Sequence, residues 1–466
     1  MNTSTTSRAP ASEAPVSAET TSPEPTRHGP TPAESTPAPS TGRFARLPLL
    51  AGRSFIPLGL FARLPLAMLT VGALTLVTAV TGSYAVGGLS AGAVGIGSAL
   101  GAPILGALAD RLGQRPVLVV AAVFNTVAVI ALILAAYLIP GGPDMASAVP
   151  VLAAAFVAGA SCPQVGPLAR VRWMALTSRG GRDANTADLD TALSYESTAD
   201  ELTFVLGPAL VGILAGLIAP WLPLALAAAL TITLVPAFAV HPTHQAVIRT
   251  PARTAASSAL EKQRRTAMPA AQRVGAFAAV ALPVLAMVCM GTFFGSTQTA
   301  LSSFSASFAT SELAGLLYAV MGLSSAAAAL SVAYWTPRFT VNARWLACAA
   351  LMAGLALLLL LPSTALPMIL VLLVLGLPVG PLMVTVFAIG GIVAPAGKLG
   401  TVMTALASGI VAGTALGSSI AGQLAQNHGY SAAFLVPVCA ASALFLLGAA
   451  AAVVLHRKKS AAPVSA

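Results

Sequence analysis

The distribution of lysine and arginine constrains the fold of this chain more than any other feature. All 24 of these residues lie in the termini or in alternate gaps between long apolar segments. The gaps that contain them are 110–116, 170–182, 241–273, 337–344 and 396–398, and the gaps that lack them lie near 88–90, 140–148, 219–222, 303–312, 361–367 and 426–431. Because loops rich in Lys and Arg stay on the cytoplasmic side of a membrane, the alternation predicts a multi-pass membrane protein with both termini in the cytoplasm.

Composition supports the same class. The chain is 57% hydrophobic and 8% charged, with a mean hydropathy of +0.86, whereas a soluble domain has roughly 25% charged residues. The net charge of +10 could suit nucleic acid, but the charges stand at the ends of apolar segments and are therefore expected to face anionic lipid. Nucleic acid is not an expected partner. The four cysteines lie within apolar segments without CxxC spacing, so neither a disulfide framework nor a metal site is indicated.

Window hydropathy predicts an all-α integral membrane protein with about twelve transmembrane helices. Residues 1–54 are expected to form a disordered cytoplasmic tail with a basic juxtamembrane end, because their Ser/Thr/Pro/Ala/Glu-rich composition cannot bury a core. Two halves of six spans, 55–240 and 274–456, flank a cytoplasmic linker at 241–273, and 457–466 forms a C-terminal tail. The predicted spans are 64–87, 91–109, 116–138, 149–171, 197–219, 221–240, 274–300, 312–334, 345–361, 366–393, 400–424 and 430–455.

A decapeptide between the second and third spans carries the most specific motif. It reads Gly106-Ala-Leu-Ala-Asp110-Arg111-Leu-Gly113-Gln-Arg115. Gly106 permits close approach to a neighbouring helix, Gly113 allows a tight turn, and Asp110 can cap a helix N-terminus or pair with an arginine. The alternative is a generic basic loop that merely obeys the charge rule.

In the order of its residues this decapeptide resembles the signature of the major facilitator superfamily, and the resemblance covers roughly 55–456. It implies two six-helix pseudo-repeat halves that rock about a substrate site near the midplane. It also implies that the motif (Gly106, Asp110, Arg111, Gly113 and Arg115) latches the cytoplasmic side in one conformation, as a gate. The equivalent loop of the second half keeps Arg338 and Arg344 without an Asp, so the latch is expected to be asymmetric.

Three acidic residues, Glu196, Asp200 and Glu201, lie around the predicted start of the fifth span at 197. Acidic groups this close to a membrane interior are functional or paired by default. Their natural partners are Arg170 and Arg172 at the end of the fourth span. Three interpretations stay open: a structural ion pair between spans four and five, a carboxylate (Asp200 or Glu201) that carries the coupling proton, or hydrated groups at the interface.

Further along this span, Gly207-Pro208-x3-Gly212 resembles the central part of the antiporter motif of proton-coupled drug exporters, although Val205-Leu206 replaces further glycines of that motif. The alternative is a proline kink with close helix packing through Gly212-x3-Gly216. Gly97-x3-Gly101 and Gly409-x3-Gly413-x3-Gly417 are likewise expected to be packing faces. In the family, spans two and eleven, and five and eight, meet between the halves.

The resemblance places spans one, four, seven and ten around a substrate cavity. The candidates for its lining are polar or aromatic residues: Thr81, Tyr84, Gln164, Phe293, Phe294, Gln298 and Phe387, with Thr78 and Met383 beside them. No charged residue lies in the middle of these spans, so neutral, lipophilic or cationic substrates are expected rather than highly charged ones.

Together these features predict a secondary transporter of the cell membrane. It would export small lipophilic or amphipathic compounds by proton antiport, through alternating access. The alternative is a proton symporter that imports a neutral metabolite. No catalytic cluster, phosphate-binding loop or metal ligand set is found, so no enzyme activity, ATPase subunit or cofactor is expected beyond the proton gradient. The expected partners are a small-molecule substrate and the bilayer, with the chain as a monomer.

Overall fold

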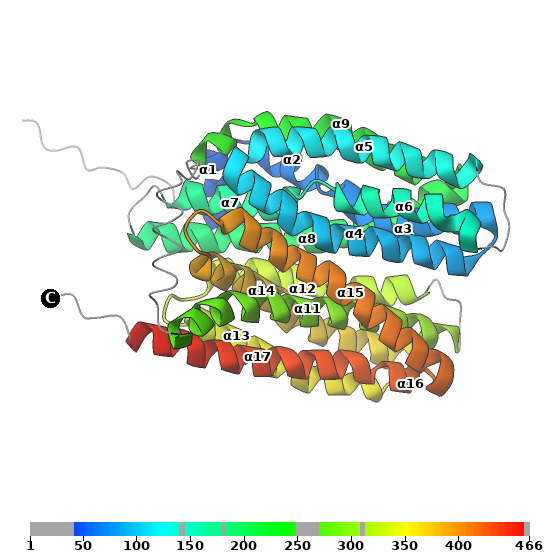
Figure 1. The fold of residues 1–466 in the computed structure, drawn as a ribbon. Helices are drawn as coiled ribbons and strands as arrows, with labels where there is room; N and C mark the ends of the chain where they lie inside the picture. The colour runs from blue at the N-terminus through cyan, green and yellow to red at the C-terminus, as the bar shows by residue number, and fades with distance from the viewer. Residues whose placement is uncertain (1–41, 139–144, 179–181, 248–269, 308–312, 461–466) are drawn as a thin grey trace, which may run out of the picture. The chain divides into compact units, whose positions relative to one another are not determined.

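Long apolar helices make up the fold (Figure 1), because a segment that crosses hydrocarbon must satisfy its backbone groups internally. The computed structural model describes residues 42–138, 145–178, 182–247, 270–307 and 313–460. The prediction of about twelve spans is confirmed. The spans are Phe55–Thr81, Val86–Leu112, Gln114–Leu138, Ala148–Thr177, Thr186–Leu217, Leu222–Val240, Val274–Ala306, Ala314–Tyr334, Val341–Leu360, Ala365–Val393, Leu399–His428 and Tyr430–Val454.

The helices fall into two groups. The first contains η1 Arg43–Arg46, α1 Leu47–Ala51, α2 Phe55–Phe61, α3 Leu64–Thr81, α4 Tyr84–Leu112, α5 Gln114–Leu138, α6 Met145–Ala160, α7 Val165–Thr177, α8 Arg182–Leu217, α9 Leu222–Val240 and η2 Pro242–Ala246. The second contains α11 Ala270–Ala306, α12 Leu313–Ser331, η3 Val332–Tyr334, α13 Val341–Ala356, η4 Leu357–Leu360, α14 Ala365–Val393, α15 Leu399–His428, α16 Tyr430–Ala433 and α17 Leu435–Ser460.

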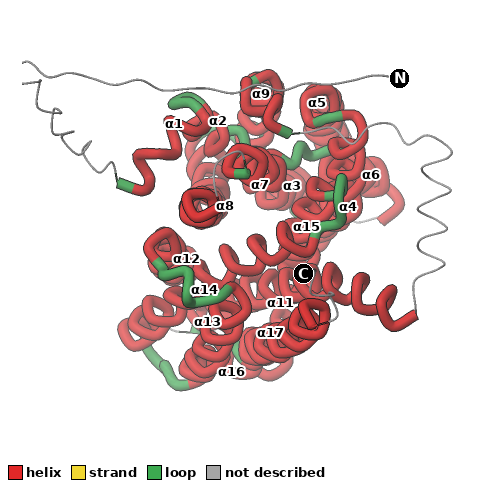
Figure 2. Tube along the Cα trace, turned by 90° about the vertical axis from the view of Figure 1, so that its left-hand side faces the viewer, coloured by secondary structure: helices red, strands yellow, loops and turns green. Residues whose placement is uncertain are grey.

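The two groups are the two six-span halves of the predicted fold, seen nearly end-on in Figure 2. In the first half α4 packs against α3 and α6, and α5 packs against α9. In the second half α11 packs against α15 and α17, and α12 packs against α14. Between the halves, α4 packs against α15 and α8 packs against α12, which are the predicted pairings of spans two with eleven and five with eight.

The first connection lies earlier than predicted. The chain turns at Gly82 and Ser83, not near 88–90, which is helical in α4. Gly82 ends α3 with a φ of 67°, and the Ser83 hydroxyl accepts a hydrogen bond from the amide of Val86 at 3.3 Å to start α4. Such capping residues decide helix ends, and an averaged hydropathy window does not register them.

The fourth span is broken into α6 and α7. The break covers 161–164 and contains Pro163, which cannot donate a backbone hydrogen bond. Asn125 of α5 supplies part of the missing bonding, because its side-chain amide donates to Ala158 O at 2.7 Å and to Ser161 Oγ at 3.3 Å. After the break, α7 continues to Thr177, six residues beyond the predicted end of the span at 171.

The ends of the halves also differ from expectation. The expectation of a disordered tail over 1–54 does not hold for 43–51, which is helical and buries Leu47 and Ala51. Residues 1–41 and 461–466 lie outside the described part, as does 248–269 of the predicted linker. The described ends of that linker are structured: η2 packs against α7, and α11 begins at Ala270.

Candidate functional site

Four charged side chains from the α2–α3 junction, α7 and α8 form a chain of ion pairs, called here the charge cluster: Arg63, Arg170, Glu196 and Asp200. Arg63 donates to Glu196 Oε2 at 2.6 Å and to Asp200 Oδ1 at 2.8 Å. Arg170 donates to the other oxygen, Asp200 Oδ2, at 2.7 Å. Asp200 therefore bridges two arginines, and the cluster is neutral when all four groups are ionised.

The cluster lies inside the protein. The side chains of Arg63, Arg170 and Glu196 are 3%, 1% and 1% exposed, and that of Asp200 is 17% exposed. Glu196 and Asp200 are four residues apart on α8, so they share one helix face as predicted. The indole of Trp173 donates to Glu196 Oε1 at 2.8 Å. Buried charges tolerate desolvation only when they are paired and hydrogen-bonded, and these two carboxylates meet that condition.

The predicted partnership of spans four and five is confirmed for one arginine only. Arg170 pairs with Asp200, whereas Arg172 pairs with no carboxylate among the described residues. Arg172 donates to Gln114 Oε1 at 2.8 Å, and to the oxygens of Phe238 and Thr243 at 2.8 and 3.0 Å. Burial, and then the charge of Arg172, lower the pKa of the nearby His241 below its ordinary value. Alternate positions on a helix face opposite sides, so Arg172 points away from the acids.

Arg63 takes the place that sequence reasoning gave to Arg172. Arg63 immediately precedes the predicted start of the first span at 64, but it lies within the span, at the junction of α2 and α3, and is 4% exposed. The sequence shows that Arg63 lies near the end of a span. It does not show the partner, Glu196, which is 133 residues away on α8. Only the packing of α3 against α8 brings the two together.

Glu201 lies on the α8 face that meets the other half. Its only hydrogen-bond partner among the described residues is the hydroxyl of Ser325 on α12, which donates to Oε1 at 2.7 Å. The residue is 7% exposed, and no described arginine or lysine pairs with it. The three acids are thereby separated: Glu196 and Asp200 are neutralised by arginine, and Glu201 has only a hydroxyl.

Asp110 joins the halves at the end of the bundle that carries Arg63, Arg111, Arg344 and Lys398, called here the basic end. Its carboxylate accepts from the amides of Gly400 and Thr401 at 2.8 Å each, and from Thr401 Oγ1 at 2.7 Å. These amides open α15, where the helix dipole favours a negative charge. Of the two predicted roles of Asp110, the structure has the helix cap and not the arginine pair.

The other motif residues divide into two kinds. A Cβ at Gly106 would lie 2.1 Å from Thr404 Oγ1, so only glycine allows this approach of α4 to α15. Gly113 has a φ of 91°, a backbone conformation that suits glycine at the turn. Arg111 and Arg115 are exposed, and neither forms an ion pair with any described residue.

Further contacts between the halves at the basic end could not be read from the sequence. Arg344, expected in a loop, is 4% exposed within the ninth span and pairs with Asp190 of α8 at 2.9 Å. Beside this pair, Leu193 is fully buried against apolar residues of α12, η3 and α14. Asp190 belongs to a part of α8 that precedes the predicted start of the span at 197, where hydropathy predicts no membrane helix.

The segment before the first span also reaches the second half. Arg43 donates to the carbonyl of Ala333 and lies over the Tyr334 ring at 5.5 Å. The ring of Phe44 lies 6.1 Å from the same tyrosine. Residues predicted to be a tail thus contact η3 directly.

The glycine motif of the fifth span is a packing site only in part. A Cβ at Gly207 would lie 2.7 Å from that of Ala67, so α8 approaches α3 closely there. Gly212 and Gly216 have no described atom within 4 Å of an added Cβ, so the expectation of close packing through this pair is wrong. Pro208 lies inside α8 as predicted.

The other two glycine stripes pack within the halves and not between them. Cβ atoms at Gly97 and Gly101 would meet the backbone of α6, and those at Gly413 and Gly417 would meet the backbone of α11. Gly409 also faces α11. The role of close α4–α15 contact falls to Gly106 instead.

The predicted cavity residues do not converge on one described cavity. Phe293 and Phe294 contact each other with ring centroids 6.0 Å apart, and both are buried. The buried amide of Gln164 donates to Cys162 O at 2.9 Å, within the break of span four. Phe387 is the member that reaches the other half, through Arg170, and Met383 is buried on the same helix, α14.

The remaining candidates are less informative. Thr81 donates to Val77 O of its own helix at 2.7 Å, and Gln298 is exposed. The Thr78 hydroxyl is buried without a partner among the described residues. The side chain of Tyr84 lies outside the described residues.

Comparison with known families settles the class of protein. The profile of the Major Facilitator Superfamily matches residues 55–408, which is most of the chain. The chain belongs to this superfamily. No curated protein matches it by sequence.

Solved structures share the major facilitator fold at low identity. The human organic anion transporter MFSD10 (TETRAN) is 19% identical, with a TM-score of 0.61, over 85% of this chain and 99% of that one. A variant of the E. coli fucose:proton symporter FucP is 14% identical, with a TM-score of 0.56, over 86% and 99%. A bacterial homologue of the iron transporter ferroportin, in an outward-facing state, is 12% identical, with a TM-score of 0.57, over 85% and 98%. At these identities the likeness shows the fold alone.

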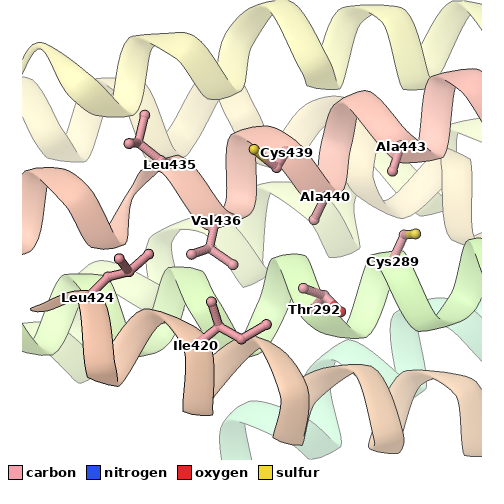
Figure 3. Close-up of a pocket in the computed structure, with 9 residues that line it drawn as sticks. All are labelled: Cys289, Thr292, Ile420, Leu424, Leu435, Val436, Cys439, Ala440 and Ala443. Carbon is pink, nitrogen blue, oxygen red and sulfur yellow. The ribbon is translucent and has the colours of Figure 1, made fainter.

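An apolar groove is also present on the second half of this major facilitator bundle (Figure 3). It encloses about 460 Å³ between α11, α15 and α17, and is lined by residues such as Cys289, Ile420, Val436 and Cys439. None of the predicted substrate residues lines it.

Proposed function

We propose that this major facilitator protein is a proton-coupled secondary transporter of the cell membrane, with cytoplasmic termini, that exports small lipophilic or amphipathic compounds in exchange for protons. The observation that carries the proposal is Glu201, a buried acid at the contact between the two halves whose described partner is the hydroxyl of Ser325. A carboxylate without a cation is unfavourable in such a place unless it binds a proton. Its protonation is therefore tied to whether α8 and α12 are in contact.

The contacts at the basic end support alternating access. Asp110 caps α15, Arg344 pairs with Asp190, and Leu193 is buried by the second half. All three join one half to the other near the same end of the bundle. This is the arrangement expected of a closed gate, which the charge rule places on the cytoplasmic side. The proton gradient would drive the cycle, with no cofactor and no ATPase subunit, in a monomer.

The different partners of Asp200 and Glu201 favour Glu201 as the residue that exchanges the proton. Asp200 bridges Arg63 and Arg170, and a negative charge there is stabilised by both arginines. Glu201 has no such partner among the described residues, so its neutral form is favoured whenever the halves are closed around it. When the basic end opens and α12 moves away, water can reach Glu201 and the proton can leave. A coupling of a few kcal/mol is enough to shift such populations.

The test is proton flux in inverted membrane vesicles that carry an acid interior. A panel of lipophilic and amphipathic compounds is added outside, and collapse of the pH gradient is recorded for wild type, Glu201→Gln and Asp200→Asn at matched expression. We expect collapse in wild type and its loss in Glu201→Gln. Ser325→Ala is the matched control: it removes the hydrogen bond but keeps the titratable carboxylate, so flux should persist.

Each other outcome is informative. Loss of flux in Asp200→Asn but not in Glu201→Gln would move the coupling site to the charge cluster. Collapse only when the compound is loaded inside the vesicles would mean that compound and proton leave together, which is symport, the mode of the alternative importer. No response from any compound in either arrangement would contradict proton-coupled transport of this class.

A further inference from the structure

Arg170 has more hydrogen-bond donors than there are acceptors around it among the described residues. Its Nη2 donates to Asp200, but Nε and Nη1 are buried and have no acceptor among the described residues. The residue is 0% exposed. The donors of a buried guanidinium are normally hydrogen-bonded, so two donors without an acceptor need an explanation. We propose that Arg170 binds the anionic group, a carboxylate, of the transported molecule; this rests on the proposed transport function and names its substrate class.

The charge cluster does not require these two donors. Asp200 already receives one hydrogen bond from Arg63 and one from Arg170, on different oxygens. Glu196 receives hydrogen bonds from Arg63 and Trp173. Nη1 can therefore donate to a second carboxylate while Nη2 keeps Asp200 in place. Such a hydrogen bond from a guanidinium to a carboxylate is charge-assisted and therefore strong.

A glycine stands beside the unpaired Nη1 of Arg170. Gly166, one turn before Arg170 on α7, presents only a hydrogen to the cluster. A Cβ built on it would lie 3.2 Å from Asp200 Oδ1, 3.7 Å from Arg170 Nη1 and 3.8 Å from Arg63 Nη1. An alanine methyl would thus occupy the approach to the idle Nη1 without removing any charge.

A residue of the other half covers the guanidinium. The Phe387 ring of α14 lies over Arg170, with its centroid 3.8 Å from Cζ. Phe387 stands on the tenth span and Arg170 on the fourth, two of the spans expected to line the substrate cavity. The contact crosses between the halves, so separation of the basic end would lift the ring away and open the donors to a ligand. When the basic end closes again, the Phe387 ring returns and can pack against an aromatic or apolar body attached to the carboxylate.

The expectation of neutral or cationic substrates assumed that the cavity-lining spans carry no buried charge. Arg170 lies seven residues inside the end of the fourth span at Thr177, which removes that assumption.

The test compares carboxylates with their uncharged amides. Benzoate, salicylate, 1-naphthaleneacetate and decanoate, each beside its amide, are measured for binding to the purified full chain by thermal stabilisation. They are then measured for gradient collapse in the vesicles described above. We expect at least one carboxylate to bind roughly tenfold or more tightly than its amide, as suits hydrogen bonds to a charged group. Arg170→Gln should abolish that difference. Equal binding of every carboxylate and its amide would overturn the proposal.

Two glycine variants test the same site without removing a charge, in case Arg170→Gln does not fold. Gly166→Ala keeps every charge and should weaken carboxylate binding while amide binding is unchanged. Gly59→Ala is its matched control, because the added Cβ would face Arg63 Nη2 at 3.8 Å with no closer contact, and both ligands should bind as in wild type. Equal weakening of carboxylate and amide in Gly166→Ala would contradict the site.

The two proposals fail in different ways. Binding of a carboxylate that depends on Arg170, without any proton flux, would retain the site and reject proton coupling. Proton flux driven by neutral compounds, with no carboxylate preference, would retain the transport function and reject the site.

Discussion

Replacing Asp110 with asparagine should release the contact between α4 and α15. The substitution keeps the size of the side chain but removes its charge. It also replaces one of the two accepting oxygens by an amide nitrogen, which faces a donor at either Gly400 or Thr401. The closed basic end should therefore become less populated.

The magnitude follows from the three hydrogen bonds that Asp110 accepts. Hydrogen bonds to a charged group contribute about 1.5–3 kcal/mol each, and the helix dipole adds roughly 0.3–1 kcal/mol. Asp110 is partly exposed, so solvent screens these interactions and one acceptor survives. We expect a net loss of about 2 kcal/mol from the closed state, which is a shift of roughly 30-fold in the ratio of closed to open molecules.

The assay is the labelling rate of a cysteine that only an open basic end exposes. Leu193→Cys serves this purpose, because Leu193 is fully buried between α8 and the second half. It is placed in a background in which the four native cysteines are replaced by alanine. A membrane-impermeant maleimide is then applied to purified protein. Asp110→Asn should raise the labelling rate by roughly the same factor of 30.

Arg111→Gln is the matched control. Arg111 belongs to the same motif and is exposed without an ion pair to any described residue, so its loss should leave the rate within about twofold of wild type. If Asp110→Asn also labelled at the wild-type rate, the cap on α15 would not hold the halves together and the gate would need another explanation.

Three other variants test the same end of the bundle by the same labelling assay. Gly106→Ala places a methyl 2.1 Å from the Thr404 hydroxyl and should weaken the closed state by about 1–3 kcal/mol, as overpacking does. Arg344→Gln leaves Asp190 without its partner at 2.9 Å and should weaken the closed state by about 2 kcal/mol, less than for a fully buried pair because Asp190 is 22% exposed. Arg43→Ala removes the contact with η3 near the surface and should raise the rate only about threefold.

Each of these variants has its own control. Gly92→Ala adds a Cβ with no described atom within 4 Å, whereas Arg338→Gln and Arg53→Ala remove exposed arginines close in sequence to Arg344 and Arg43. All three controls should label as wild type does. If Arg344→Gln labelled at the rate of Arg338→Gln, the Asp190 pair would not join the halves. If Gly106→Ala labelled like Gly92→Ala, or Arg43→Ala like Arg53→Ala, the role given to that residue would be refuted.

Helix number and the functional motif could be predicted from the sequence because both are local properties. Twelve spans are each long and apolar enough to cross a bilayer on their own. The motif from Gly106 to Arg115 predicted a close approach, a tight turn and a helix cap. Gly106, Gly113 and Asp110 have these roles in the structure. The predicted helix ends were less accurate, since Ser83 acts through one side-chain hydrogen bond and Pro163 through its missing backbone donor.

Tertiary structure alone decided which charges meet. Arg63, Arg170 and Arg172 all stand next to predicted span ends, at 64 and 171, but the structure pairs the first two with acids and directs the third to neutral oxygens. It also separates the adjacent residues Asp200 and Glu201, sending one to the charge cluster and the other to Ser325 of the opposite half. Such choices depend on the rotation of each helix about its axis and on its neighbour. Apolar content and charge position do not encode these quantities, because every face of a membrane helix can be apolar.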